Sequence, residues 1–96
     1  MESNWIAKLM VERYLEKYLP LPTCRWSQFY LDQRLYARCA AREIIRRLDT
    51  LELGPYETIE KFISDLSAGI DADPADKVSD AFRIARGAAM DILDYI

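Results

Sequence analysis

Residues 55–70 read PYETIEKFISDLSAGI, and this stretch decides the fold because its apolar residues recur with the period of an α-helix. Steps of three, one, three and four positions separate the members of this face, which are Ile59, Phe62, Ile63, Leu66 and Ile70. Pro55 stands where proline is favoured, in the first helical turn. The pattern predicts an amphipathic helix over about residues 55–68, with Gly69 as its terminator.

Upstream, the chain begins with a second helical pattern. Ser3 or Asn4 is expected to cap a helix that ends at about Tyr18, because a proline-containing connector follows. The apolar residues expected on its buried side are Trp5, Ile6, Leu9, Met10, Leu15 and Tyr18. Their spacing is the least regular in the chain, so this helix is the weakest candidate for the core.

A longer helix is expected at about residues 28–50, with Ser27 as its N-cap. Its core-facing residues are predicted to be Tyr30, Ala37, Ala41, Ile44 and Leu48. A smaller apolar strip, formed by Leu31, Leu35 and Cys39, occupies another side of the helix. Between the two strips runs a row of arginines spaced four residues apart, Arg34, Arg38, Arg42 and Arg46. An apolar strip beyond a row of charges needs a partner.

Downstream, Asp73 is the expected cap and Pro74 the first residue of a last helix that reaches about Tyr95. Its main apolar face is predicted to be Val78, Phe82, Ala85, Ala89, Leu93 and Ile96. Four amphipathic helices with short connections predict an all-α fold, a compact four-helix antiparallel bundle, formed by residues 1–96 as a single helical domain. The alternative is a three-helix core with the N-terminal helix at its periphery.

Charge is segregated along the 96 residues, although the chain as a whole carries a net charge of −3. Residues 1–48 contain nine Lys/Arg and five Asp/Glu, for a net charge of +4. Residues 49–96 contain four Lys/Arg and eleven Asp/Glu, for a net charge of −7. The arginine row therefore concentrates basic charge in an acidic protein.

Several classes of function lack support in the residues. Histidine is absent, which removes the commonest general base and a frequent metal ligand, so we expect a protein that is not an enzyme and that holds no metal and no cofactor. Charges interrupt every apolar run, so no membrane span is expected. Cys24 and Cys39 are interpreted as packing residues of a reduced, cytoplasmic protein.

The arginine row admits three interpretations. It could meet a protein partner with an acidic surface or a second copy of the chain, and Leu31 and Leu35 would then add apolar contact. It could bind nucleic acid, although the negative net charge ranks this lower. It could also pair internally with the acidic second half, and Glu43 with Arg47 already has the favourable i,i+4 order. The aspartates near residues 65–80 are read first as caps, and otherwise as phosphate mimics toward a basic partner.

Three stretches of the second half carry a resemblance to a group of proteins: TIEKF at residues 58–62, AFRIA at residues 81–85 and DILD at residues 91–94. In these the chain resembles short helical proteins of clostridial genomes and mobile elements, to which no activity is attached. The resemblance implies a context in which small proteins bind and block host proteins. The arginine row and the flanking Leu31 and Leu35 lead us to expect a protein-binding module, and the resemblance adds the role of a small regulator or inhibitor of a host protein. The alternatives are nucleic-acid binding through the same row and a homo-oligomeric structural protein.

Overall fold

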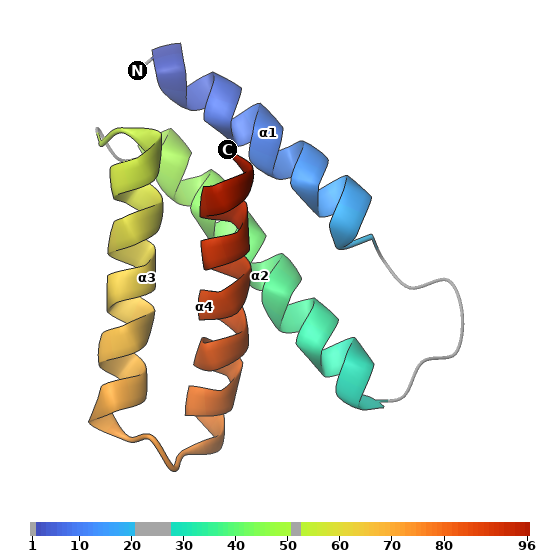
Figure 1. Ribbon diagram of the computed structural model, residues 1–96, viewed down its shortest axis with the longest axis vertical. Coiled ribbons are helices and arrows are strands. Elements are labelled where there is room, and N and C mark those ends of the chain that lie inside the picture. Colours follow the sequence, from blue (N-terminus) through green and yellow to red (C-terminus); the bar gives the residue numbers. More distant parts are fainter. Residues whose placement is uncertain (1, 21–27, 51–52) are drawn as a thin grey trace.

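The computed structural model describes the backbone of residues 2–20, 28–50 and 53–96, and most of it is helical. The helices are α1 (Glu2–Tyr18), α2 (Gln28–Thr50), α3 (Pro55–Ala72) and α4 (Lys77–Tyr95). In Figure 1, α3 and α4 stand side by side as an antiparallel hairpin, and the antiparallel pair α1 and α2 crosses it obliquely. The predicted all-α, four-helix bundle is confirmed.

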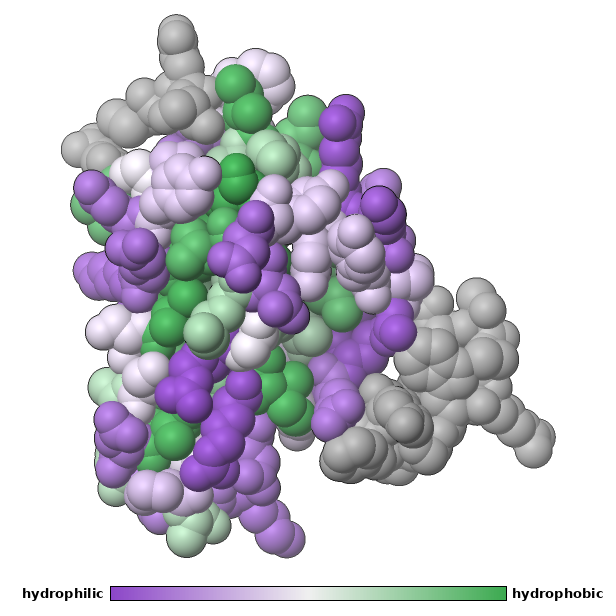
Figure 2. Space-filling view, viewed as in Figure 1, coloured by the Kyte–Doolittle hydropathy of each residue, from purple (hydrophilic) through white to green (hydrophobic). Residues whose placement is uncertain are grey.

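The core is shared by all four helices. Its fully buried apolar residues include Val11 from α1, Ile44 from α2, Ile59 from α3 and Ile92 from α4. Figure 2 shows a column of apolar side chains where α3 and α4 face each other. Because α1 contributes Ala7 as well as Val11 to the same cluster, it belongs to the bundle and is not a peripheral addition.

The face of α1 that is buried differs from the predicted one. Asn4, Ala7 and Val11 point inward, whereas the larger Trp5, Ile6 and Leu9 are exposed, as is Tyr18. Of the predicted residues, Leu15 packs against the core, whereas Val11, which the prediction omitted, is fully buried. Asn4 is not a cap: its amide nitrogen donates to the carbonyl oxygens of Leu48 at 3.3 Å and Leu53 at 3.0 Å.

The start of α3 agrees with the prediction, but its end does not. Gly54 is the N-cap and Pro55 is the first helical residue, yet the helix continues to Ala72. Gly69 therefore lies inside α3 and does not terminate it. The ring of Phe82 from α4 packs directly over this glycine, because a Cβ added there would lie 2.7 Å from Cε2 of Phe82. Gly69 permits close approach of two helices.

The start of α4 lies three residues later than predicted. Asp76, not Asp73, is the N-cap, and its carboxylate accepts a hydrogen bond from the amide of Val78 at 3.1 Å. Asp73 instead caps the end of α3. Val78 is exposed, while Ile92, which the predicted apolar face omitted, is fully buried. In the first turn of α4 the buried residue is Ser79.

The bounds of α2 match the predicted range of residues 28–50. The predicted core positions Ala37, Ala41, Ile44 and Leu48 are buried, and Ala40 joins them. Ser27, the expected N-cap, lies outside the described residues, and the side chains of Tyr30 and Leu31 are likewise outside what the structure describes. One side of α2 is thus packed in the core, and another side of the same helix is exposed.

Candidate protein-binding surface

Two of the four arginines in the row hold the end of α1. Nη1 of Arg34 donates to the carbonyl oxygens of Pro20 at 3.1 Å and of Tyr18 at 3.4 Å, and Arg38 donates to that of Leu19. The last carbonyls of a helix have no intrahelical partner and form the negative end of its dipole. Two guanidinium groups from α2 therefore cap α1 and fix it against its neighbour.

Arg46, the last arginine of the row, donates hydrogen bonds to Glu43 of the same helix. Nε of Arg46 donates to Glu43 at 2.9 Å, and Nε of Arg47 donates to the same carboxylate at 3.0 Å. The hydrogen bond from Arg46 is the main cause that lowers the pKa of Glu43 from 4.5 to about 2, with Arg47 contributing, although burial opposes the shift. The predicted i,i+4 pair of Glu43 and Arg47 is confirmed.

Pairing with the acidic half of the chain occurs, but through a different arginine. Arg47, which is outside the predicted row, forms an ion pair with Asp65 of α3, with 3.0 Å between Nη1 and Oδ2. Its Cζ atom also lies 4.8 Å from the centroid of the Phe62 ring. Arg42 is exposed, and no hydrogen bond or ion pair joins it to the rest of the described chain. The row is thus divided into two capping residues, one exposed cation and one residue paired with Glu43.

The exposed side of α2 carries apolar residues as well. Leu35 is 49% exposed, which agrees with its assignment to the strip outside the core, and the neighbouring Tyr36 is 42% exposed. Cys39 is a free, exposed thiol, so its interpretation as a packing residue is wrong. Leu35, Cys39, Arg42 and Arg46 follow one another at steps of four, three and four, which places them along one line of the helix.

An apolar groove of about 400 Å³ lies beside this line, between α2, α3 and α4. It is lined by Tyr36, Cys39, Ala40, Glu43, Phe62, Leu66, Ala81, Phe82 and Ala85. Glu43 is the one charged residue of the lining. We call the exposed residues Leu35, Tyr36, Cys39, Arg42 and Arg46 the α2 face. The α2 face therefore combines apolar side chains, two cations and a neighbouring recess.

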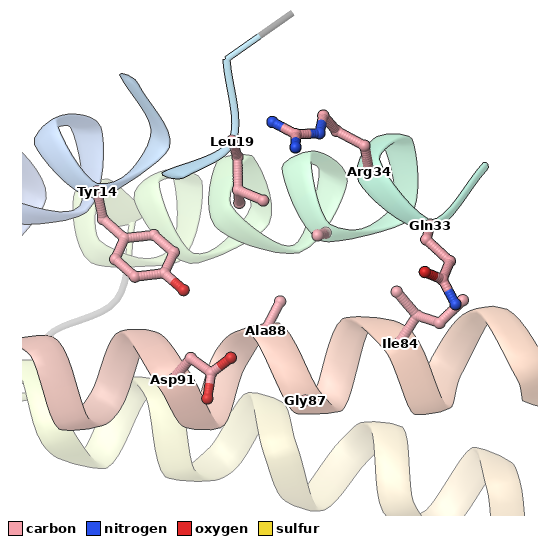
Figure 3. Close-up of a pocket in the computed structure, with 9 residues that line it drawn as sticks. Tyr14, Leu19, Gln33, Arg34, Ile84, Gly87, Ala88 and Asp91 are labelled. Carbon is pink, nitrogen blue, oxygen red and sulfur yellow. The ribbon is translucent and has the colours of Figure 1, made fainter. Parts of the chain in front are cut away.

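A second recess, also about 400 Å³, lies between α1, α2 and α4 and is more polar (Figure 3). The phenol of Tyr14 points toward the carboxylate of Asp91 across it. Burial raises the pKa of Tyr14, and the charge of Asp91 adds to the increase. A phenol that keeps its proton more firmly is a hydrogen-bond donor and a poor general base.

Sequence reasoning selected α2 as the helix that carries the candidate binding surface, but it missed what surrounds this helix. The capping of α1 depends on the backbone carbonyl oxygens of Tyr18 and Leu19. Because every residue has a backbone carbonyl, the residue types at these positions do not predict the contact. The groove requires three helices to meet. The exposure of Cys39 was available as a signal, because this residue follows Leu35 by one helical turn. Leu31, also assigned to the binding surface, lies in α2, but its side chain is among those that the structure does not describe.

No helix among the described residues is both long and apolar enough to cross a bilayer. Within the same residues, no three His, Cys, Asp or Glu side chains form a group able to hold a metal ion. Comparison of the chain with models of protein families, with curated proteins and with solved structures found no match.

Proposed function

We propose that this protein is a non-enzymatic binding module that docks a protein with an acidic surface through the α2 face. The observation that carries the proposal is the adjacency of exposed Leu35 and Tyr36, the open apolar groove, and the exposed guanidinium of Arg42. An interface of this composition gains affinity from apolar contact, whereas charge sets orientation and association rate. Binding and blocking a host protein is the regulatory role that we assign to it.

The division of the arginine row narrows the chemistry of the partner. Arg34 and Arg38 already donate to backbone carbonyls, and Arg46 is bound to Glu43. A phosphate backbone would have to compete with these contacts, and the chain carries a net charge of −3. Nucleic acid therefore ranks below an acidic protein. The free thiol of Cys39 supports a reducing compartment, and we assign the protein to the cytoplasm.

The test is recovery of the partner from lysate of the native host on tagged protein, before and after nuclease treatment. We expect one stoichiometric protein that survives nuclease and is lost when Leu35→Asp is combined with Arg42→Glu. The matched control combines Met90→Asp with Lys61→Glu, because Met90 is a similarly exposed apolar residue and Lys61 is an exposed cation, both on other helices.

Two results would contradict the proposal. Equal loss of binding in both double variants would show that net charge, and not the α2 face, governs the interaction. Recovery that disappears after nuclease treatment would assign the surface to nucleic acid. In that case affinity would also fall steeply as salt concentration rises, because counterions released from the phosphates dominate such binding.

A further inference from the structure

The first turns of α1 expose large apolar side chains. Trp5 is 61% exposed and Ile6 is 51% exposed, and Leu9 is also on the surface. Amphipathic helices normally bury their largest apolar residues and expose their polar ones. Here the inward positions are taken by Ala7 and Val11, which leaves the bulkier side chains in water. Their exposure is a cost that a second contact surface would remove.

This apolar surface continues onto two other helices. Ile6 and Met10 line a shallow hollow of about 160 Å³ together with Tyr56 at the start of α3 and Ile96 beyond the end of α4. Tyr56 is 54% exposed, and its hydroxyl donates to the carbonyl oxygen of Ile96 at 3.1 Å. Figure 2 shows apolar surface at the end of the molecule where α1 begins and α4 ends. We call Trp5, Ile6, Leu9, Met10, Tyr56 and Ile96 the α1 patch.

The charges around the α1 patch do not select a charged partner. No side chain of the patch is ionisable except the Tyr56 phenol, and α1 contains three acidic and three basic residues. Lys8, the cation nearest to the patch in sequence, forms an ion pair with Asp49 at 3.0 Å. Binding to anionic bilayers requires an excess of positive charge on the polar side of the helix, which α1 lacks. The surface that complements the patch is itself apolar and uncharged.

We propose that the α1 patch is the interface of a two-fold homodimer, in which α1 of one copy packs antiparallel against α1 of the other. A two-fold axis at the level of residues 7–8 pairs residue 5 with residue 10 and residue 6 with residue 9 of the second copy. Trp5 then covers Met10, a favourable sulfur–aromatic contact, and Ile6 covers Leu9. The patch is self-complementary in this register, as a two-fold interface requires.

The area of the patch sets the strength of the dimer. If the exposed part of these side chains averages roughly 80 Å², with Trp5 and Tyr56 above this average and Met10 and Ile96 below it, the six together expose roughly 500 Å². Two copies would bury roughly 1,000 Å² in total, about the lower limit for a specific interface. The dimer is therefore weak, with a dissociation constant on the order of 10–100 µM. It shares no residue with the α2 face, so either proposal can fail without the other.

Sedimentation of the full chain from about 1 µM to about 500 µM, a range that spans this constant, tests the proposal. The mass should rise from 11.2 kDa toward twice that value. Ile6→Lys with Leu9→Lys should remain monomeric, whereas the control Val78→Lys with Met90→Lys, two equally exposed residues of α4, should dimerise as the unmodified chain does. A monomer at every concentration, or equal loss in both variants, would overturn the proposal.

The register is tested separately by disulfide formation after Cys24→Ser and Cys39→Ser. A mixture of the Ile6→Cys and Leu9→Cys chains should cross-link more than either chain alone, because residues 6 and 9 face each other across the axis. Equal cross-linking of all combinations would overturn the register. Sedimentation of the protein with uncharged phosphatidylcholine vesicles, abolished by Ile6→Lys with Leu9→Lys, would instead assign the patch to a lipid surface and overturn the dimer.

Discussion

Replacing Gly69 with alanine tests the closest contact between α3 and α4, because two opposing effects act at this position. Alanine is the better helix former, by about 0.8–1.0 kcal/mol. The new Cβ, however, would lie 2.7 Å from Cε2 and 2.9 Å from Cδ2 of Phe82. Either the ring or the helix must then move. Overpacking of this kind costs about 1–3 kcal/mol, so we expect a net destabilisation of about 1 kcal/mol.

Gly87→Ala is the matched control. Gly87 also lies within a helix, α4, but an added Cβ would meet no atom within 4 Å. The propensity gain then acts alone, and we expect stabilisation by up to about 1 kcal/mol. For a domain of this size each change corresponds to about 4–8 °C in melting temperature. The two variants should therefore move in opposite directions, with a difference of about 2 kcal/mol between them.

Urea unfolding followed by circular dichroism measures both free energies. In a Phe82→Leu background the clashing ring atoms are absent, so Gly69→Ala should recover the propensity gain. If Gly69→Ala and Gly87→Ala stabilise the unmodified chain equally, Phe82 swings aside without cost, and the reasoning is refuted. Because Phe82 also lines the apolar groove, a displaced ring would in addition weaken the partner binding that we propose for the α2 face.

Three further outcomes follow from single contacts. Arg38→Gln should lower the free energy of unfolding by about 1–2 kcal/mol, measured by urea unfolding, because the carbonyl of Leu19 loses a charged donor. The pKa of Glu43 is lowered from 4.5 to about 2, so its contribution is complete above pH 4.5 and is lost as pH falls toward 2. Unfolding across this window should show a loss of about 1 kcal/mol, after allowance for screening around Arg46, and Glu43→Gln should abolish it. Asp76→Ala should lower the melting temperature by an amount corresponding to about 1 kcal/mol, whereas Asp73→Ala should change it less, since only Asp76 caps α4 with its side chain.

The sequence predicted those features of the fold that depend on neighbours in the chain. Periodicity located the four helices, and Pro55 marked the first residue of α3. Gly69 was misread because the usual role of a glycine after an apolar run is to end a helix, whereas here a ring from α4 decides its role. The spacing of residues within one helix does not predict which residues of another helix will contact it.

The candidate site shows the same division. The spacing of Leu35 placed it away from the core side of α2, whereas it left open whether Arg42 was exposed or paired internally, and the structure shows Arg42 exposed. The roles of Arg34 and Arg38 could not be predicted, since their partners are backbone carbonyls that every residue possesses. The buried side of α1 was predicted wrongly for a related reason. The spacing of the apolar residues of α1 is irregular, and their positions along the chain did not show which side of the helix would meet α2.

Hydrogen bonds hold α1 at both ends, and this has a consequence for its axial position. A seam of small apolar residues such as Ala7 and Val11 offers similar contacts at several offsets, so it resists sliding only weakly. Asn4 and Arg38, in contrast, each reach acceptors at one offset. The two contacts therefore fix the axial position of α1 relative to α2. This position does not depend on the length of the chain segment that joins the two helices.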